Sequence, residues 1–267
     1  AIVRMFYAWN SGFSPNNPSS LEGWAKANGK IPVISVKTKT TGGQAVSWSD
    51  IASAKKGSPL YTQMVTWADR MKAWPGEVYF CLNHEASNTK SLANGTAPEY
   101  IAAWQKMHKI FDKEGVTNVI WTWIIGGTIP WEVPTTDRRY GPKWYPGDDW
   151  VDVLAVDVYN WSTCDHSMPW RSFDSLTAAF QAFAAQHPTK ATMVTEFGTA
   201  EEPGDPTAKA DWITQAAEDV KSWNNLQAFM AFHSQYRNTP GCQWWLDTSK
   251  KSLKAAQAVG AQPYYGG

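Results

Sequence analysis

The sequence of 267 residues has no excess of charge of either sign, and this absence limits the partners it can have. It contains 24 Lys and Arg against 24 Asp and Glu. Nucleic-acid-binding proteins usually carry a basic patch or stripe, so the sequence predicts no nucleic-acid partner. It also lacks any apolar run of about 18 residues, the length that signals a membrane-spanning helix. We therefore expect no membrane span.

Short motifs for metals and cofactors are missing as well. No C-x-x-C or H-E-x-x-H spacing is present, so we expect neither a structural zinc site nor a protease-type zinc site. No glycine-rich fingerprint follows an expected strand, which argues against a dinucleotide-binding open sheet. The sequence thus predicts an activity that needs no cofactor and no metal. One alternative stays open, a metal-dependent hydrolase that uses Asp165, His166 and His187.

Cysteine is scarce, with three residues in the chain. Cys81 lies in an expected strand and is predicted to be a buried free thiol. Cys164 and Cys242 follow expected strands, in the loop segments "WSTCDHS" and "TPGCQWW". A disulfide between them suits a secreted protein, but sequence spacing does not decide the pairing. We expect a secreted, extracellular protein and leave the disulfide open.

Tryptophan is unusually frequent, with 17 copies beside 10 Tyr and 10 Phe. Many Trp stand next to Pro, Gly or Asp, as in "GTIPWEVP" and "GPKWYPGDDW", which is typical of loops. Flat rings in loops can stack on the apolar face of a sugar, although packing within the protein explains them equally well. Trp123, Trp161 and Trp244 are expected at or just after strand ends, where they would line a sugar-binding cleft.

Strand and helix patterns alternate along the whole chain. Seven apolar runs read as strands buried on both faces, at 1–9, 30–38, 77–85, 117–125, 151–160, 190–198 and 226–235. Helical patterns lie between and after them, at 19–28, 58–74, 96–114, 172–186, 205–224 and 248–259. The alternation predicts a parallel sheet, and eight such units would close an α/β protein of the (β/α)₈ TIM-barrel type.

Local signals mark three of the helix starts. Ser19 with Glu22 and Thr96 with Glu99 have the spacing of capping boxes, and Pro59 suits a first helical position. No linker or low-complexity segment divides the chain. Residues 1–267 are therefore predicted to form a single catalytic barrel domain, and we expect a monomer.

Two glutamates stand at the ends of expected strands, where barrels place their catalytic groups. Glu85 lies in "FCLNHEASN" and Glu196 lies in "MVTEFGT". Either one alone could be a buried ion pair. Together they predict the two carboxyl groups of a retaining glycoside hydrolase, which lie about 5–5.5 Å apart.

Other polar side chains are expected around this pair. Tyr159 ends the strand before the one that carries Glu196, so its phenol can donate to that carboxylate, unless it only packs at the rim. Asn83 and His84 directly precede Glu85 and are expected to bind substrate. His233, near the end of the last expected strand, is a further candidate for substrate binding.

Three segments resemble glycoside hydrolase family 26 of clan A: "NHEAS", "KWYPGDDWVDVLAVDVYN" and "VTEFGT". The resemblance implies that Glu85 is the acid/base on the fourth barrel strand and Glu196 the nucleophile on the seventh. It also implies that Tyr159 on the sixth strand donates to the nucleophile and that His84 binds at the cleavage subsite. In this order "HE" ends the fourth strand, whereas it ends the third strand found here. The first strand is therefore expected upstream, missing from the chain as given.

The sequence departs from the family around the acid/base. Family members commonly have an Arg where this chain has Cys81, and a Met-Asn-Gly segment where this chain has "ASNTKS". These positions shape the sugar subsites, so the family's common mannanase specificity does not carry over. We expect endo-acting hydrolysis of a β-linked polysaccharide or oligosaccharide, with mannan, xylan, β-glucan and bacterial exopolysaccharide all open. The competing hypothesis is a barrel that binds carbohydrate without cleaving it.

Overall fold

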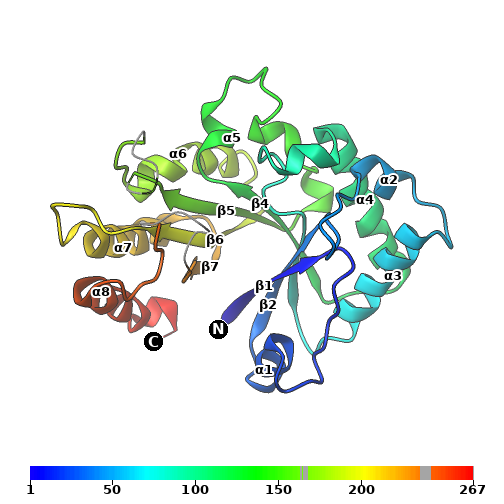
Figure 1. Ribbon diagram of the computed structural model, residues 1–267, viewed down its shortest axis with the longest axis horizontal. Coiled ribbons are helices and arrows are strands. Elements are labelled where there is room, and N and C mark those ends of the chain that lie inside the picture. Colours follow the sequence, from blue (N-terminus) through cyan, green and yellow to red (C-terminus); the bar gives the residue numbers. More distant parts are fainter. Residues whose placement is uncertain (163, 165–167, 235–241, 267) are drawn as a thin grey trace. The chain divides into compact units, whose positions relative to one another are not determined.

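The computed structural model describes residues 1–162, 164, 168–234 and 242–266 (Figure 1). The chain forms two compact units, Ala1–Leu154 and Ala155–Gly267. The single domain predicted from the sequence stays a prediction. None of the helices in the described ranges is both long enough and apolar enough to cross a membrane.

Four parallel strands form the sheet of the first unit, in the order of the sequence. They are β1 (Ile2–Ala8), β2 (Ile31–Lys37), β3 (Val78–Leu82) and β4 (Val119–Gly126). One row of the register runs through all four strands and pairs Met5 with Ile34, Ile34 with Phe80, and Phe80 with Trp121. All four of these side chains are buried, so this row is part of the hydrophobic core.

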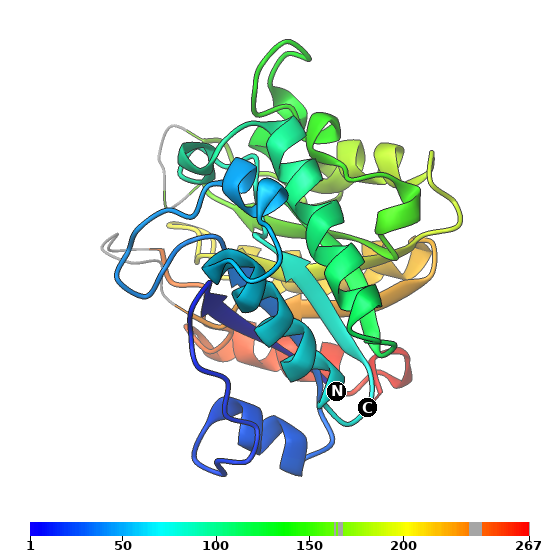
Figure 2. The same cartoon turned by 90° about the vertical axis from the view of Figure 1, so that its right-hand side faces the viewer.

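Helices α3 and α4 pack against each other in the first unit, and α4 also packs against α2 (Figure 2). The α-helices of this unit are α1 (Leu21–Ala27), α2 (Trp48–Ser53), α3 (Pro59–Lys72), α4 (Ala97–Lys113) and α5 (Ile129–Glu132). Its short 3₁₀ helices are η1 (Ser91–Asn94), η2 (Gly141–Trp144) and η3 (Asp148–Trp150).

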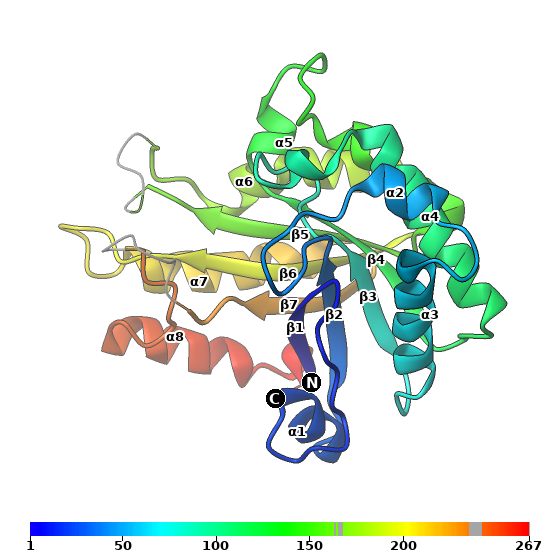
Figure 3. The ribbon, with the colours of Figure 1, turned by 45° about the vertical axis from the view of Figure 1, so that its right-hand side comes forward.

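The second unit holds the remaining strands and helices (Figure 3). Its strands are β5 (Val153–Asn160), which belongs to this unit from Ala155 onward, β6 (Ala191–Thr199) and β7 (Leu226–Ala231). Strands β6 and β7 pair in parallel. The helices are α6 (Phe173–Ala184), α7 (Ala208–Asp219) and α8 (Lys250–Gly260), with the 3₁₀ helices η4 (Val220–Ser222) and η5 (Pro263–Tyr265).

The seven strands predicted from the sequence are all present among the described residues. Pro59 begins α3 and the Glu99 carboxylate accepts from the Thr96 N–H at 2.7 Å, as predicted. The predicted capping box of Ser19 is wrong. Ser20 caps α1 instead, since its hydroxyl accepts from the Gly23 N–H at 2.9 Å, and the Glu22 carboxylate accepts from the phenol of Tyr7 at 2.7 Å.

Two boundaries near the expected site also differ from the prediction. β3 ends at Leu82 rather than at residue 85, because Asn83 and Glu85 take positive φ angles that a strand does not allow. β7 ends at Ala231, so His233 lies two residues beyond the strand. Helices α2 and α5 were not predicted, since each is shorter than two turns and has little periodicity to read.

Candidate active site

The residues predicted for the site occur in both units. The first unit contains Asn83, His84, Glu85 and Trp123. The second contains Tyr159, Trp161, Glu196, His233 and Trp244.

Glu85 lies in a strained turn at the end of β3. Its φ is +52°, a left-handed conformation that costs a residue other than glycine about 1–2 kcal/mol. The turn is fixed on both sides, because the Glu85 N–H donates to the Ile124 carbonyl at 2.9 Å and its carbonyl accepts from Asn88 at 2.9 Å. The carboxylate lies over Gly126, where a Cβ atom would come within 3.3 Å of Oε1. Strain of this kind is typical of functional sites.

The side chain of Asn83 forms hydrogen bonds that stabilise this turn. Its Oδ1 accepts from the N–H and the hydroxyl of Thr38, both at 3.0 Å, and its Nδ2 donates to the Ser91 hydroxyl at 3.3 Å. The residue is buried and also has a positive φ, which asparagine tolerates better than most residues. These bonds argue for a structural role in place of the predicted contact with substrate.

His84 is a buried, neutral histidine beside the acid/base candidate. Its ring packs edge-on against Phe6 at 5.3 Å between centroids, and Nδ1 is buried without a hydrogen-bond partner. Burial, together with the positive charges of Lys37 and Arg4, lowers the pKa of His84 well below its usual value. The predicted role in substrate binding stays a prediction, and a neutral imidazole with a free nitrogen suits a sugar hydroxyl.

Glycine at position 85 is expected to stabilise the fold relative to alanine. Both Glu85→Gly and Glu85→Ala remove the carboxylate, but glycine takes a φ near +52° without steric cost. The glycine variant should be more stable by about 1 kcal/mol in urea unfolding. As a control, the same pair at Glu218 in helix α7 should show the reverse order. Equal stability of the two Glu85 variants would contradict strain at this turn.

The neutral state of His84 predicts a specific loss of stability in acid. An unfolded chain protonates histidine below pH about 6.5, whereas the folded protein keeps His84 neutral because its pKa is lowered. The free energy of unfolding should therefore fall as the pH drops below 6.5, by at most about 1.4 kcal/mol per pH unit from this residue. Urea unfolding of His84→Gln at pH 7, 6 and 5 should lack this component. His233→Gln, at an exposed histidine, should retain it, and identical pH profiles for all three proteins would contradict the prediction.

Glu196 lies at an irregularity in β6 that changes how its side chain points. Between Val194 and Phe197 the strand advances three residues while β7 advances from Phe229 to Ala231. Successive residues of a regular strand face opposite sides of the sheet, and a bulge can re-aim a side chain. The bulge lets two successive residues of β6 bind the same face of β5. Thr195 donates to Asp157 at 2.6 Å, and Glu196 accepts from Tyr159.

Tyr159 donates its phenol hydrogen to Oε2 of Glu196, as predicted from the sequence. The Tyr159 ring is held among aromatic neighbours, with centroid distances of 5.0 Å to Trp244, 5.6 Å to Trp161 and 5.9 Å to Phe232. Glu196 is 8% exposed. A hydrogen bond to the charged form favours a carboxylate. The arrangement therefore orients the carboxyl group and favours the charged form that a nucleophile requires.

The predicted stacking tryptophans differ in exposure. Trp123 and Trp244 are each 1% exposed, and Trp123 lies within β4 rather than at its end. Their rings contact protein, Trp123 against Tyr145 at 5.2 Å and Trp244 against Trp161 at 5.2 Å. Their burial argues against the predicted stacking on sugars. Trp161 is partly exposed and keeps that prediction.

Two further tryptophans, in the short helices α5 and η2, bind backbone carbonyls of the protein. The indole N–H of Trp144 donates to the Arg138 carbonyl at 2.9 Å, and that of Trp131 donates to the Gly126 carbonyl at 2.8 Å.

His233 also has a protein partner, since its Nδ1 accepts from the Leu246 N–H at 3.0 Å. Its ring is exposed, so its role with substrate stays a prediction.

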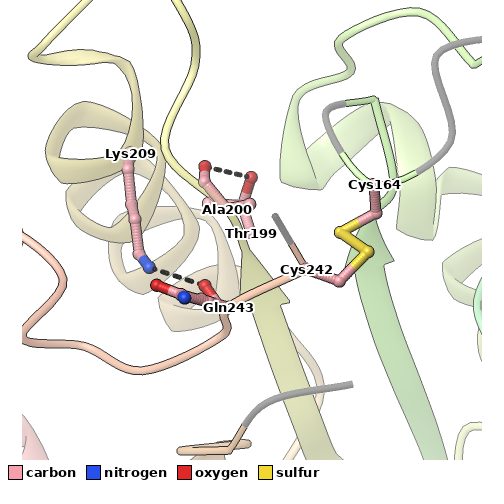
Figure 4. The surroundings of a disulfide bond; sticks show 6 residues. All are labelled: Cys164, Thr199, Ala200, Lys209, Cys242 and Gln243. Atoms are coloured by element: carbon pink, nitrogen blue, oxygen red, sulfur yellow. Dashed lines mark hydrogen bonds between the residues drawn. A yellow bond between two sulfur atoms is a disulfide. The ribbon is translucent and has the colours of Figure 1, made fainter. Parts of the chain in front are cut away.

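A disulfide joins Cys164 to Cys242 and answers the question that sequence spacing left open (Figure 4). Cys242 and Trp244 pack with Ala200, and Tyr159 and Trp161 lie against this cluster. Cys81 is buried and forms no disulfide, as predicted. The disulfide therefore anchors the segment that carries Trp244 beside the Tyr159 ring.

Sequence reasoning missed the bulge at Glu196 and the buried Lys209. A bulge has no signature in a single apolar run, so nothing in "TMVTEFG" identifies it. Lys209 did have a signal, because it falls on the apolar stripe of α7 with Trp212, Ile213 and Ala216.

The described residues hold no group of three His, Cys, Asp or Glu side chains placed to bind a metal ion. Asp165 and His166, two of the ligands in the metal-dependent alternative, lie outside the described residues. His187 packs on Phe183 with 4.6 Å between ring centroids.

Comparison with known proteins connects these two groups of residues to one family. The pattern of the family described as glycosyl hydrolase family 26 matches residues 62–203. Endoglucanase H of Acetivibrio thermocellus is 31% identical over 274 residues, covering 97% of this chain and 27% of that protein. Mannan endo-1,4-beta-mannosidase of Thermothelomyces thermophilus is 35% identical over 51 residues, covering 19% of this chain and 8% of that protein. The chain thus spans about a quarter of the first relative's length, and its match to the second covers less than a tenth of that protein.

Solved structures show the same fold. A GH26 β-mannanase from Bacteroides ovatus matches with a TM-score of 0.65 at 18% identity, covering 98% of this chain and 79% of that chain. A modular endo-β-1,4-mannanase from Cellulomonas fimi matches with a TM-score of 0.63 at 20% identity, covering 98% of this chain and 63% of that chain. At these identities the likeness concerns the fold, which is the TIM barrel predicted from the sequence.

Proposed function

Because the chain belongs to glycosyl hydrolase family 26, we propose that it is a retaining, endo-acting glycoside hydrolase of β-linked polysaccharides. The observation that carries this proposal is the hydrogen bond from Tyr159 to Glu196 at the bulge of β6. It orients a carboxylate as a nucleophile and favours its charged form. The strained turn that presents Glu85 supports a second, separately positioned carboxyl group.

In the proposed first step, the Glu196 carboxylate attacks the anomeric carbon and forms a glycosyl ester. The bond from that carbon to the glycosidic oxygen breaks, and the leaving oxygen takes the proton of Glu85. In the second step, the Glu85 carboxylate removes a proton from water while the water oxygen attacks the same carbon. The ester bond breaks, Glu196 is free again, and two inversions give net retention.

The names of the relatives give the order in which substrates should be tested. The relative that aligns along 97% of this chain is named an endoglucanase, and the solved structures are named β-mannanases. We therefore propose a β-linked glucan as the first substrate and mannan as the second. We also propose that the protein is secreted, which the disulfide supports, because disulfides persist in oxidising compartments.

The test is the configuration of the first product. Purified β-glucan, mannan and xylan would be incubated with the protein, and new reducing ends would be measured. Proton NMR of the product before mutarotation should show the β-anomer. An α-anomer would reject the double displacement. Binding of a glycan in calorimetry without any released sugar would instead support the non-catalytic carbohydrate-binding barrel.

A further inference from the structure

Lys209 is a buried lysine whose ammonium group holds one short segment of backbone. The side chain is 1% exposed. Its Nζ donates to the Trp245 carbonyl at 2.7 Å, to the Thr248 hydroxyl at 2.9 Å and to the Gln243 carbonyl at 3.3 Å. Figure 4 shows Lys209 reaching from α7 to Gln243, close to the disulfide. Each of the three ammonium protons therefore has an acceptor.

Packing alone does not account for a lysine at this position. Burial lowers the pKa of Lys209 to about 8, although the negative charges of Glu201 and Asp247 act in the opposite direction. Glu201 in turn accepts from the Thr248 hydroxyl at 2.6 Å and from the Ser252 hydroxyl at 2.8 Å. A methionine would fill a similar volume on this apolar stripe without desolvating a charge. Unlike methionine, the lysine can donate hydrogen bonds to the two backbone carbonyls and to the Thr248 hydroxyl.

The two carbonyls that Lys209 binds stand on either side of Trp244. The Trp244 ring lies 5.0 Å from the ring of Tyr159, measured between centroids. Gly198 makes room for this contact, since a Cβ atom there would lie 3.3 Å from both rings. The hydroxyl of Tyr159 donates to Glu196, two residues before Gly198 on β6. A continuous set of contacts thus leads from Lys209 to the proposed nucleophile.

We propose that Lys209 is a positioning residue for the reaction: by fixing the backbone around Trp244, it keeps Tyr159 in place to donate to Glu196. The inference rests on the proposed roles of Tyr159 and Glu196. Without the lysine contacts, the backbone around Trp244 is less restrained, and the Tyr159 hydroxyl is hydrogen-bonded to the Glu196 carboxylate for a smaller fraction of the time. The charged form of Glu196 therefore loses part of its stabilisation.

The coupling can be measured without turnover, by NMR titration of protein labelled with ¹³C at the glutamate carboxyl carbons. The Glu196 signal is assigned by its absence in Glu196→Gln. In Tyr159→Phe its titration midpoint should rise by about one pH unit, because a hydrogen bond to the charged form is lost. In Lys209→Met it should rise by a fraction of that, about half a unit. Lys254→Met, at an exposed lysine of α8, should leave the midpoint unchanged.

A double-mutant cycle separates positioning from the loss of a positive charge. An electrostatic effect of Lys209 on Glu196 would persist without the tyrosine hydroxyl, so it would add to the effect of Tyr159→Phe. Positioning acts through that hydroxyl, so Lys209→Met in the Tyr159→Phe background should cause no further rise. Lys209→Arg, which keeps the charge and can donate to the same carbonyls, should restore most of the wild-type midpoint.

Additive shifts in the cycle, or a Lys209→Met midpoint equal to that of Lys254→Met, would overturn the proposal. If Lys209→Met does not fold, Thr248→Val removes one of its three acceptors and should produce a smaller rise, and an unchanged midpoint there would also overturn it. The proposed function fails on a different observation, the absence of glycan hydrolysis by the wild-type protein. The two failures are therefore distinguishable.

Discussion

Replacement of Glu196 by alanine is expected to lower kcat on any hydrolysed glycan by about 10⁴-fold or more. The variant lacks the group that forms the glycosyl ester, so the route through two displacements is closed. Reducing-end release by Glu196→Ala and the wild-type protein measures the loss. Glu202→Ala, at a partly buried carboxylate elsewhere in the second unit, serves as the control and should retain activity. A Glu196→Ala protein within tenfold of wild type would remove this residue from the mechanism.

Removal of Glu85 should leave a different signature. Glu85→Ala is expected to lower kcat by about 10²–10⁴-fold on an unactivated glycan, the usual contribution of a general acid. The loss in the first step should be much smaller on an aryl glycoside whose leaving group needs no proton. Added azide should attack the glycosyl ester in Glu85→Ala and give a β-glycosyl azide, whereas in Glu196→Ala it should replace the nucleophile and give an α-glycosyl azide. The same azide product from both variants would contradict the assigned roles.

Loss of the Cys164–Cys242 disulfide is expected to produce the largest change in stability. The bond joins residues 78 positions apart, and closing a loop of that length stabilises the folded state by about 4.5 kcal/mol on the chain-entropy estimate. For a chain of this size, Cys164→Ser with Cys242→Ser should therefore lower Tm by about 10 °C. Differential scanning calorimetry measures the shift.

Reductant provides the matching control for this prediction. Dithiothreitol should lower the Tm of the wild-type protein to that of the double serine variant and leave the variant itself unchanged. Cys81→Ala should keep its sensitivity to reductant, because Cys81 is not part of the disulfide. A wild-type Tm that is insensitive to dithiothreitol, with the bond shown to be broken by thiol titration, would contradict the estimate.

The strand order and fold class could be predicted because they depend on periodic burial. β2 and β3 are buried along almost their whole length, and such runs stand out in a sequence. The ends of elements could not be placed as well, because they depend on local backbone angles and single contacts. The positive φ at Asn83 shortened β3, and a single bond from the Gly23 N–H to the Ser20 hydroxyl places the cap of α1 at Ser20 rather than at Ser19.

The hydrogen bond from Tyr159 to Glu196 could be predicted, since both residues lie near the ends of neighbouring strands. The role of the tryptophans could not be read in the same way. A tryptophan in the sequence can stack on a sugar or donate to a backbone carbonyl of the protein, and the sequence does not distinguish these two roles. The burial of Trp123 and Trp244 follows from the folded structure and not from their sequence context. The bulge at Glu196 was equally invisible, because it is a property of the pairing between β6 and β7.

The left-handed backbone at Glu85 has an evolutionary consequence. A glutamate codon becomes a glycine codon through one nucleotide change, and glycine suits the φ of +52° better than glutamate does. That single step removes the proposed acid/base and relieves the backbone strain at this position at the same time. Descent from an active hydrolase to an inactive carbohydrate-binding protein would therefore meet no barrier from the backbone at this position. Purifying selection on catalysis alone would have to keep the glutamate in place.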